Sequence, residues 1–253
     1  MAEFSIHQFS NKLLQKSIFP HLMAYLHWQT GQANLPNNKF APISINLDLT
    51  TACNFQCPHC LDEEIINTGK MLNLQYIKRL LENWSKKGLK SVILIGGGEP
   101  TIYPYFEEVV KFLKKLSLQV GIVSNGTTFK KIENICHLLN KKDWIRLSLD
   151  ASTNETFQKI HRPRVRVTLD EITAGVKKIR QKNPNLQIGY SFLIIGDDKK
   201  VNNVPLVKNI GEIAQTARLA KESGFNYLSL KPFINPEGKR ETVINQKNLK
   251  EIK

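Results

Sequence analysis

The chain has 253 residues, 41% of them hydrophobic, which is enough to bury a substantial core as one or two domains. Its formal net charge is +14. Lysine pairs at 86–87, 114–115, 141–142 and 177–178 fall at or near the ends of helical patterns, where cations complement the helix dipole. This placement indicates a solvated basic surface, so a nucleic acid is disfavoured as a partner, although the charge leaves it open.

No apolar run approaches the ~20 residues of a membrane span, and the N-terminus lacks the basic-then-apolar pattern of a secretory signal. We therefore expect a cytoplasmic protein with no membrane partner. In that compartment, clustered cysteines bind metals or take part in catalysis more often than they form disulfides.

Residues 1–40 are expected to form an N-terminal helical segment (13–18 and 21–28) and a polar linker (34–38). From residue 41 onward, strand-like and helical patterns alternate. Strands are predicted at 43–50, 91–95, 119–123, 144–149, 187–195 and 227–231, and helices at 74–86, 105–116, 129–139, 169–181 and 207–222. Two capping boxes, Ser152 with Glu155 and Thr168 with Glu171, also mark helix starts.

Six strands at this spacing predict an α/β core over residues 41–235, in which a parallel sheet carries helical crossovers. Residues 236–253 are expected to form a tail. The chain ends about twenty residues after the sixth strand, which fits either a minimal barrel or a C-terminally truncated sequence.

Polar side chains alternate with apolar ones along several strands, which distinguishes an open barrel from a doubly wound sheet. A doubly wound sheet buries both faces, whereas a closed barrel fills its lumen with apolar residues. Here one face of each strand is polar, as in Asn46, Asp48 and Thr50; Arg146, Ser148 and Asp150; and Tyr227, Ser229 and Lys231. We therefore predict a partial, open parallel (βα)6 TIM-like barrel around a polar ligand, in which Asp48 and Arg146 form an ion pair or contact substrate.

Three of the four cysteines, Cys53, Cys57 and Cys60, follow the first strand with the spacing C-x3-C-x2-C. They are too close together to staple a fold, and they converge from one loop. Structural zinc takes four ligands and a [4Fe–4S] cluster normally takes four cysteines, but Cys136 lies far away in a helical pattern. A cubane held by three cysteines would keep one iron open for reaction.

Other candidate ligand groups follow the later strands, and ligands in parallel α/β folds bind at the carboxyl ends of strands. The run Gly96-Gly97-Gly98-Glu99-Pro100 follows the second strand and matches neither a P-loop nor a dinucleotide-binding turn. The remaining candidates are Ser124 and Asn125 after the third strand, Ser148 and Asp150 at the fourth, Arg162 and Arg164 shortly afterwards, Ile195 at the fifth and Lys231 at the sixth.

The cysteine spacing followed by G-G-E-P on a βα pattern resembles the radical S-adenosylmethionine (SAM) enzymes over residues 42–233. The resemblance implies that Cys53, Cys57 and Cys60 ligate a [4Fe–4S] cluster whose fourth iron is chelated by SAM. By the same resemblance, the residues that bind the SAM ammonium group are Gly97, Gly98 and Glu99, with Pro100 shaping the turn.

The resemblance also implies roles around the rest of the cofactor. Ser148 and Asp150 would contact the polar end or ribose of SAM, and Arg162 or Arg164 its carboxylate. His59 and the backbone of 194–196, which includes Ile195, would lie near the adenine. Ser124, Asn125 and Lys231 complete the candidate set, with Lys231 placed either on a ligand or on neighbouring strand carbonyls. His161 is expected to be a loop residue that positions Arg162.

The activity implied is reductive cleavage of SAM to a 5′-deoxyadenosyl radical, which abstracts hydrogen from a peptide or small metabolite. The electron would come from a flavodoxin- or ferredoxin-type donor, and the cluster would be oxygen-sensitive. No cysteine follows Cys136, so the chain lacks the auxiliary clusters of SPASM-type members. Two alternatives stay open: an enzyme acting on RNA or nucleotides, and a non-catalytic metal-binding protein. The latter would take a fourth ligand from Cys136, His161 or His59, the last expected to be out of reach.

Overall fold

The computed structural model describes residues 16, 18–32, 41–197 and 199–233, and within them six parallel strands form one sheet. The strand order is β1-β2-β3-β4-β5-β8, so β1 and β8 are edges and the barrel is open, as predicted. The strands are β1 (Ser44–Leu47), β2 (Ser91–Leu94), β3 (Gln119–Ser124), β4 (Trp144–Ser148), β5 (Gln187–Ile194) and β8 (Tyr227–Pro232).

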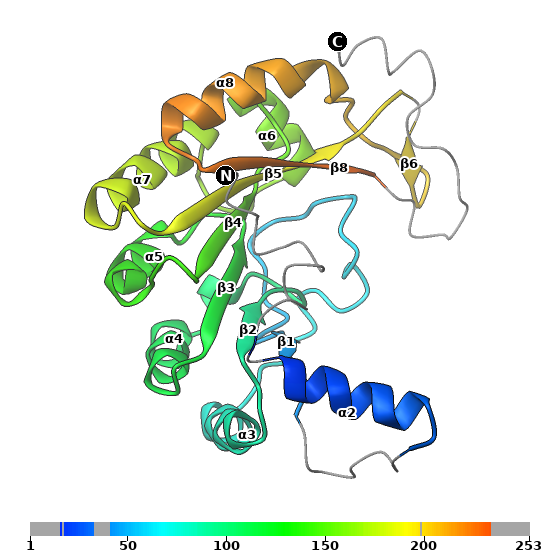
Figure 1. Ribbon diagram of the computed structural model, residues 1–253. Helices are drawn as coiled ribbons and strands as arrows, with labels where there is room; N and C mark the ends of the chain where they lie inside the picture. The colour runs from blue at the N-terminus through cyan, green and yellow to red at the C-terminus, as the bar shows by residue number, and fades with distance from the viewer. Residues whose placement is uncertain (1–15, 17, 33–40, 198, 234–253) are drawn as a thin grey trace.

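Helices cover the outer face of this curved sheet, and the cysteine loop lies on its inner side (Figure 1). The crossover helices are α3 (Leu74–Lys86), α4 (Phe106–Lys115), α5 (Phe129–Ile135), α6 (Asn154–His161), α7 (Leu169–Lys182) and α8 (Ile213–Ser223), with short 3₁₀ turns at Pro100–Ile102, Cys136–Leu138 and Ile210–Glu212. None of these helices, nor α2 near the N-terminus, has the length and apolar character needed to cross a membrane.

The helix starts follow from local capping, with one correction. At α7 the predicted capping box is present: Thr168 and Glu171 exchange side-chain and backbone hydrogen bonds. At α6 the predicted box is wrong, because Thr153 is the N-cap and accepts from the backbone N–H of Thr156. The Ser152 hydroxyl instead donates to the carboxylate of Glu212, joining the β4 exit to the start of α8.

The last predicted helix begins later than residue 207, and a small hairpin precedes it. The segment before α8 is held in place by Asn209, which is 1% exposed. Its side chain accepts from the N–H of Ile195 and donates to the carbonyls of Asp150 and Leu193. These bonds keep the segment beside β5. In the chain, the hairpin of β6 (Lys200–Val201) and β7 (Val204–Pro205) lies between β5 and this segment.

The N-terminal prediction is confirmed over residues 21–28 by helix α2 (Phe19–Gln29). None of its residues is buried, whereas Ile18 just before it is 5% exposed. Most of the predicted 13–18 segment, the linker 34–38 and the tail 236–253 fall outside the described residues. The core described here therefore runs from residue 41 to residue 233.

The registers stack the inward-facing residues in layers. Val123 pairs with Arg146, Arg146 with Gly189 and Gly189 with Tyr227, which makes one layer across four strands. The next layer toward the carboxyl ends joins Ser148, Ser191 and Ser229, and a further one joins Leu193 with Lys231. Large apolar residues between these positions, such as Leu147 and Phe192, are fully buried under the helices. The polar lumen predicted from the alternation is thus present.

Gly189 has no room for a side chain, which gives a stability prediction. A Cβ at this position would lie 2.1 Å from Cζ of Tyr227, within a rigid ring that lies across β5. We expect Gly189→Ala to lower the free energy of unfolding by about 1–3 kcal/mol through overpacking. Urea denaturation measures this. Gly211→Ala is the matched control, because nothing lies within 4 Å of its Cβ position. An unchanged unfolding midpoint in Gly189→Ala would contradict the packing described.

Candidate active site

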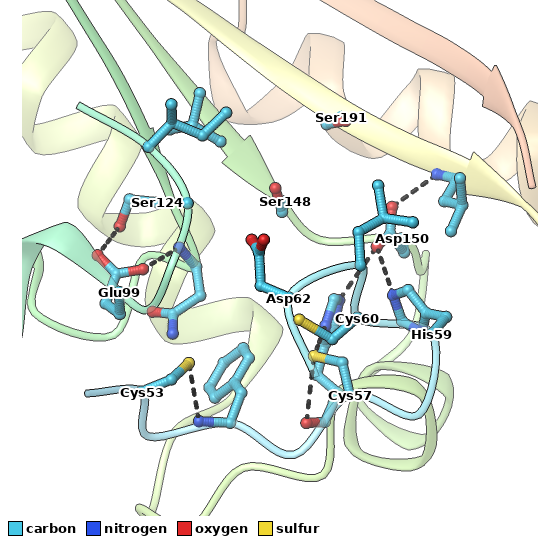
Figure 2. A pocket seen from close by; sticks show the side chains of 18 of the residues that line it. Cys53, Cys57, His59, Cys60, Asp62, Glu99, Ser124, Ser148, Asp150 and Ser191 are labelled. Carbon is cyan, nitrogen blue, oxygen red and sulfur yellow. Dashed lines mark hydrogen bonds and ion pairs between the residues drawn. The ribbon is translucent and has the colours of Figure 1, made fainter. Parts of the chain in front are cut away.

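A cavity of about 580 Å³ opens at the carboxyl edge of the sheet. Figure 2 shows the three cysteines along one side of it, Glu99 and Ser124 on a second side, and Asp150 with His59 on a third. The cavity is lined by most of the residues singled out from the sequence, namely Cys53, Cys57, His59, Cys60, Gly97, Gly98, Glu99, Ser124, Asn125, Ser148, Asp150 and Lys231. Loops that are distant in sequence therefore meet at one site.

The three thiols are a donor set that suits an iron–sulfur cluster. Burial raises the pKa of each, most strongly for Cys57, where the charges of Cys60, Asp150 and Cys53 add to the effect. The thiols are therefore protonated at neutral pH, and a metal centre would displace those protons. Among the described residues lining the cavity there is no fourth cysteine, and Cys136 is buried elsewhere, in the turn after α5. Soft ligands with one coordination position left open fit a [4Fe–4S] cluster.

The glycine run supports the cysteine loop from the side. Gly96 and Gly97 have φ angles of +76° and +60°, in the left-handed region that favours glycine. A Cβ on Gly98 would lie 2.2 Å from the carbonyl oxygen of Ala52, the residue before Cys53. The next N–H, from Glu99, donates to that same carbonyl at 2.9 Å. Gly98 is thus required for close contact between the two loops.

Glu99 is a buried link between the exits of β2 and β3. Its Oε1 accepts from the N–H and hydroxyl of Thr101 and from the Ser124 hydroxyl, and its Oε2 accepts from the N–H of Asn125 at 2.7 Å. Burial raises the pKa of this carboxyl and the hydrogen bonds oppose that rise. Glu99 therefore organises the cavity wall, and Oε2 keeps a lone pair toward it. Pro100 is buried in the turn after Glu99, away from the cavity lining.

Asn54, inside the cysteine run, was not singled out from the sequence. Its side-chain oxygen accepts from Asn125 Nδ2, and its own Nδ2 donates to the Thr127 hydroxyl, both at 2.8 Å. No pattern in the sequence distinguishes Asn54 from any polar loop residue. Together with the Gly98 contact, these bonds anchor the cysteine loop to two strand exits.

Asp150 lies two residues after β4, has a φ of +50° and is 5% exposed. Its Oδ1 accepts from the N–H of Leu193 at 2.6 Å, and its Oδ2 lies 3.6 Å from Nε2 of both His59 and His161. Burial opposes ionisation, but the His59 hydrogen bond and the histidine charges together hold the pKa of Asp150 below its usual value. Asp150 therefore fixes the β4 exit against β5 and orients two imidazoles.

His161 corrects the sequence-based interpretation. It is the last residue of α6 rather than a loop residue, it is 2% exposed, and its Nδ1 lies 3.2 Å from Sγ of Cys57. Its Nε2 lies 2.9 Å from the Leu149 carbonyl oxygen, which can only accept, so Nε2 carries the proton. Burial lowers the pKa of His161 to about 4, so the ring is neutral at pH 7.

The two histidines also lie closer to the cysteines than the sequence indicated. Ligand atoms of Cys57, His59 and His161 are all within 4.8 Å of one another, so His59 is not out of reach of a metal bound at Cys57. The backbone carbonyl of His161 accepts from the N–H of Gln56 at 3.1 Å. The end of α6 therefore holds the cysteine loop in place.

Three of the remaining candidates lie outside the cavity lining. Arg162 is exposed, with a φ of +46° at the end of α6, and it shares a separate small hollow with Ile195. Arg164 is exposed as well, but its N–H donates to the Asn54 carbonyl at 2.8 Å and its charge favours the thiolate of Cys53. Of the two arginines, Arg164 is thus the one adjacent to the cysteine loop.

The fold and site together define an open parallel α/β barrel with a three-cysteine cavity at its carboxyl edge. Residues 47–202 match the family described as the radical SAM superfamily. The chain belongs to this superfamily of enzymes, whose members use a [4Fe–4S] cluster and SAM.

Relatives and solved structures agree with this assignment. The chain is 24% identical over 214 residues to YydG of Bacillus subtilis, named as a peptide biosynthesis protein, covering 82% of this chain and 59% of YydG. It is 26% identical to an S-adenosylmethionine-dependent nucleotide dehydratase of Flammeovirga pacifica, covering 67% of this chain and 56% of that protein. The crystal structure of Streptococcus suis SuiB superposes with a TM-score of 0.63 at 15% identity, over 92% of this chain and 52% of SuiB. The chain thus spans little more than half the length of each.

Proposed function

We propose that Cys53, Cys57 and Cys60 hold a [4Fe–4S] cluster and that the chain abstracts hydrogen from a peptide or small metabolite bound in the lumen. The observation that carries the proposal is the convergence of three part-buried thiols with the glycine run on one cavity. When bound, the cluster and SAM supply a 5′-deoxyadenosyl radical, with electrons from a flavodoxin- or ferredoxin-type donor.

The chain's own residues would bind and orient SAM on this cavity. Gly97 and Gly98 make a wall without side chains, beside which Oε2 of Glu99 can accept a hydrogen bond from an ammonium group. Ser148 and Asp150 would hold the ribose or the polar end of SAM, and Arg164, whose charge acts on Cys53, would contact the SAM carboxylate. His59, Ser124, Asn125 and Lys231 complete the proposed contacts.

A peptide substrate is supported by the similarity to YydG over most of this chain. A nucleotide substrate is the second candidate, supported by the similarity to the nucleotide dehydratase. The net charge of +14 does not separate them, since helix-terminal lysines such as Lys86 and Lys115 belong to the outer surface.

The test is 5′-deoxyadenosine formation by the anaerobically reconstituted full chain, given SAM and a strong reductant. We expect product in the wild type and a loss of at least about 10³-fold in Cys57→Ala, because the cluster would lack a ligand. Cys136→Ala is the matched control, since Cys136 is a buried thiol outside the cavity and should leave the activity unchanged.

Iron, sulfide and zinc analysis accompanies the assay. Iron and sulfide that depend on Cys57 support the proposed centre. The opposite result would be zinc without sulfide, with the zinc retained when Cys53 is replaced but lost when His59 or His161 is replaced. That result would favour a structural metal bound by Cys57, His59 and His161.

A further inference from the structure

Arg146 is a part-buried cation near two aromatic rings, those of Trp144 and Tyr227, at the inner end of the lumen. Its guanidinium carbon lies 5.6 Å from the centroid of the Trp144 ring. The Trp144 ring covers Gly121 on β3, where a Cβ would meet it at 2.4 Å, and the Tyr227 ring covers Gly189 on β5 in the same way. The two glycines on the strands flanking β4 thus leave room for rings that hold the guanidinium in place.

No carboxylate of the described chain neutralises Arg146. Its Nε is buried without a hydrogen-bond partner. The ion pair with Asp48 considered from the sequence is absent among the described residues, whose ion pairs do not include it. Burial lowers the pKa of Arg146, and among the described residues the acidic group that opposes this is the Tyr227 hydroxyl, whose own pKa burial raises to about 12. A buried charge without a counter-ion is costly and rarely kept without a ligand.

Arg146 lies beneath the lining of the cavity rather than in it, and its neighbours on the same face of the sheet form that lining. Val123, its register partner on β3, lines the cavity, as does Ser148, two residues further along β4. Lys231 stands nearer the mouth, four residues along β8 from Tyr227, or about 13 Å at the usual strand rise. Burial lowers the pKa of Lys231, and the positive charge of Arg146 lowers it further. The two cations therefore contribute positive charge to the same part of the lumen.

We propose that the Arg146 guanidinium binds a carboxylate of the substrate at the inner end of the lumen. A guanidinium edge accommodates the two oxygens of a carboxylate as a bidentate pair. A phosphate needs more donors than this layer offers, since Val123 and Gly189 contribute no polar side chain and the Tyr227 hydroxyl is the one polar group beside Arg146 among the four residues of the layer. The substrate class is therefore a carboxylic acid, as an acidic peptide group or a free acid.

This inference rests on the proposed function only in placing the substrate in the lumen, and its test needs no turnover. Succinate serves as the carboxylate probe, succinamide as its neutral counterpart and inorganic phosphate as the competing anion. Binding is followed by Trp144 fluorescence in the metal-free full chain carrying Trp28→Phe and Trp84→Phe, and by equilibrium dialysis of labelled succinate against the reconstituted full chain. A protein that binds succinate but forms no 5′-deoxyadenosine would separate the two proposals.

One variant removes the positive charge of Arg146, and a control variant removes a positive charge elsewhere on the protein. We expect saturable succinate binding in the millimolar range, weakened about tenfold or more in Arg146→Gln. Lys200→Gln removes one exposed positive charge in the β6–β7 hairpin and should leave binding unchanged. Melting curves establish whether Arg146→Gln is folded. If it is not, Arg146→Lys decides, since it keeps the charge and loses the planar fork.

Weakened binding in the Arg146 variant, with no displacement by succinamide or phosphate, supports the assignment. Succinate binding that is absent in the wild type, or that is unchanged in the folded Arg146 variant, would overturn it. Displacement of succinate by a lower concentration of phosphate would also overturn it, in favour of a phosphate-bearing substrate.

Discussion

Replacing Gly98 by alanine is expected to weaken cluster retention by about 10- to 100-fold, the range seen when groups that support metal ligands are lost. The added Cβ would lie 2.2 Å from the Ala52 carbonyl oxygen, so either the glycine run or the cysteine loop must move. A shift of Ala52 moves Cys53, the next residue, and also disturbs the Glu99 hydrogen bond to the same carbonyl. Iron and sulfide per chain and the visible absorbance after anaerobic reconstitution measure the effect.

Gly211→Ala is the control for this experiment, because it adds the same methyl group where nothing lies within 4 Å. It should retain the cluster as the wild type does. Normal iron and sulfide in Gly98→Ala would show that Gly98 is not needed to hold the cysteine loop. A variant that fails to fold would be recognised by its melting curve.

The titration of His161 is expected to remove about 3 kcal/mol of stability from the metal-free protein as the pH falls from 6.5 to 4. Burial lowers the pKa of His161 to about 4 in the folded state, against an ordinary value of 6.5. Above pH 6.5 His161 is neutral in both the folded and the unfolded chain, so its titration no longer changes the stability. Below that pH the unfolded chain takes up a proton that the folded chain does not, so stability falls until the folded pKa is reached.

Urea denaturation at a series of pH values measures this slope. His161→Gln should remove most of it, whereas His137→Gln, which changes an exposed histidine, should keep it. The pKa of Asp150 lies below its usual value, so protonation of this carboxylate destabilises the protein only at a pH below this window. An equal slope in wild type and His161→Gln would show that His161 titrates normally.

Much of the fold could be predicted because strand and helix periods are local properties of the chain. Alternation at Arg146, Ser148 and Asp150 placed a polar face inside an open barrel, and the registers confirm it. Helix α8 began six residues later than predicted because Asn209 makes hydrogen bonds to residues around β5, which no local pattern reveals. The Ser152 capping box failed for the same reason, since its hydroxyl is engaged by Glu212, 60 residues away.

For the site, the local sequence was enough to identify the loops that carry chemistry. The cysteine run (Cys53, Cys57 and Cys60) and the glycine run both lie at strand ends, and parallel strands bring those ends to one edge. The three-dimensional structure was needed to see what supports these loops. It showed that Gly98 contacts Ala52, that His161 contacts Cys57 from α6, and that Arg146 Nε is buried without a hydrogen-bond partner among the described residues. These are contacts between residues far apart in the chain, so they depend on the side-chain packing of the assembled barrel and have no signature in the local sequence.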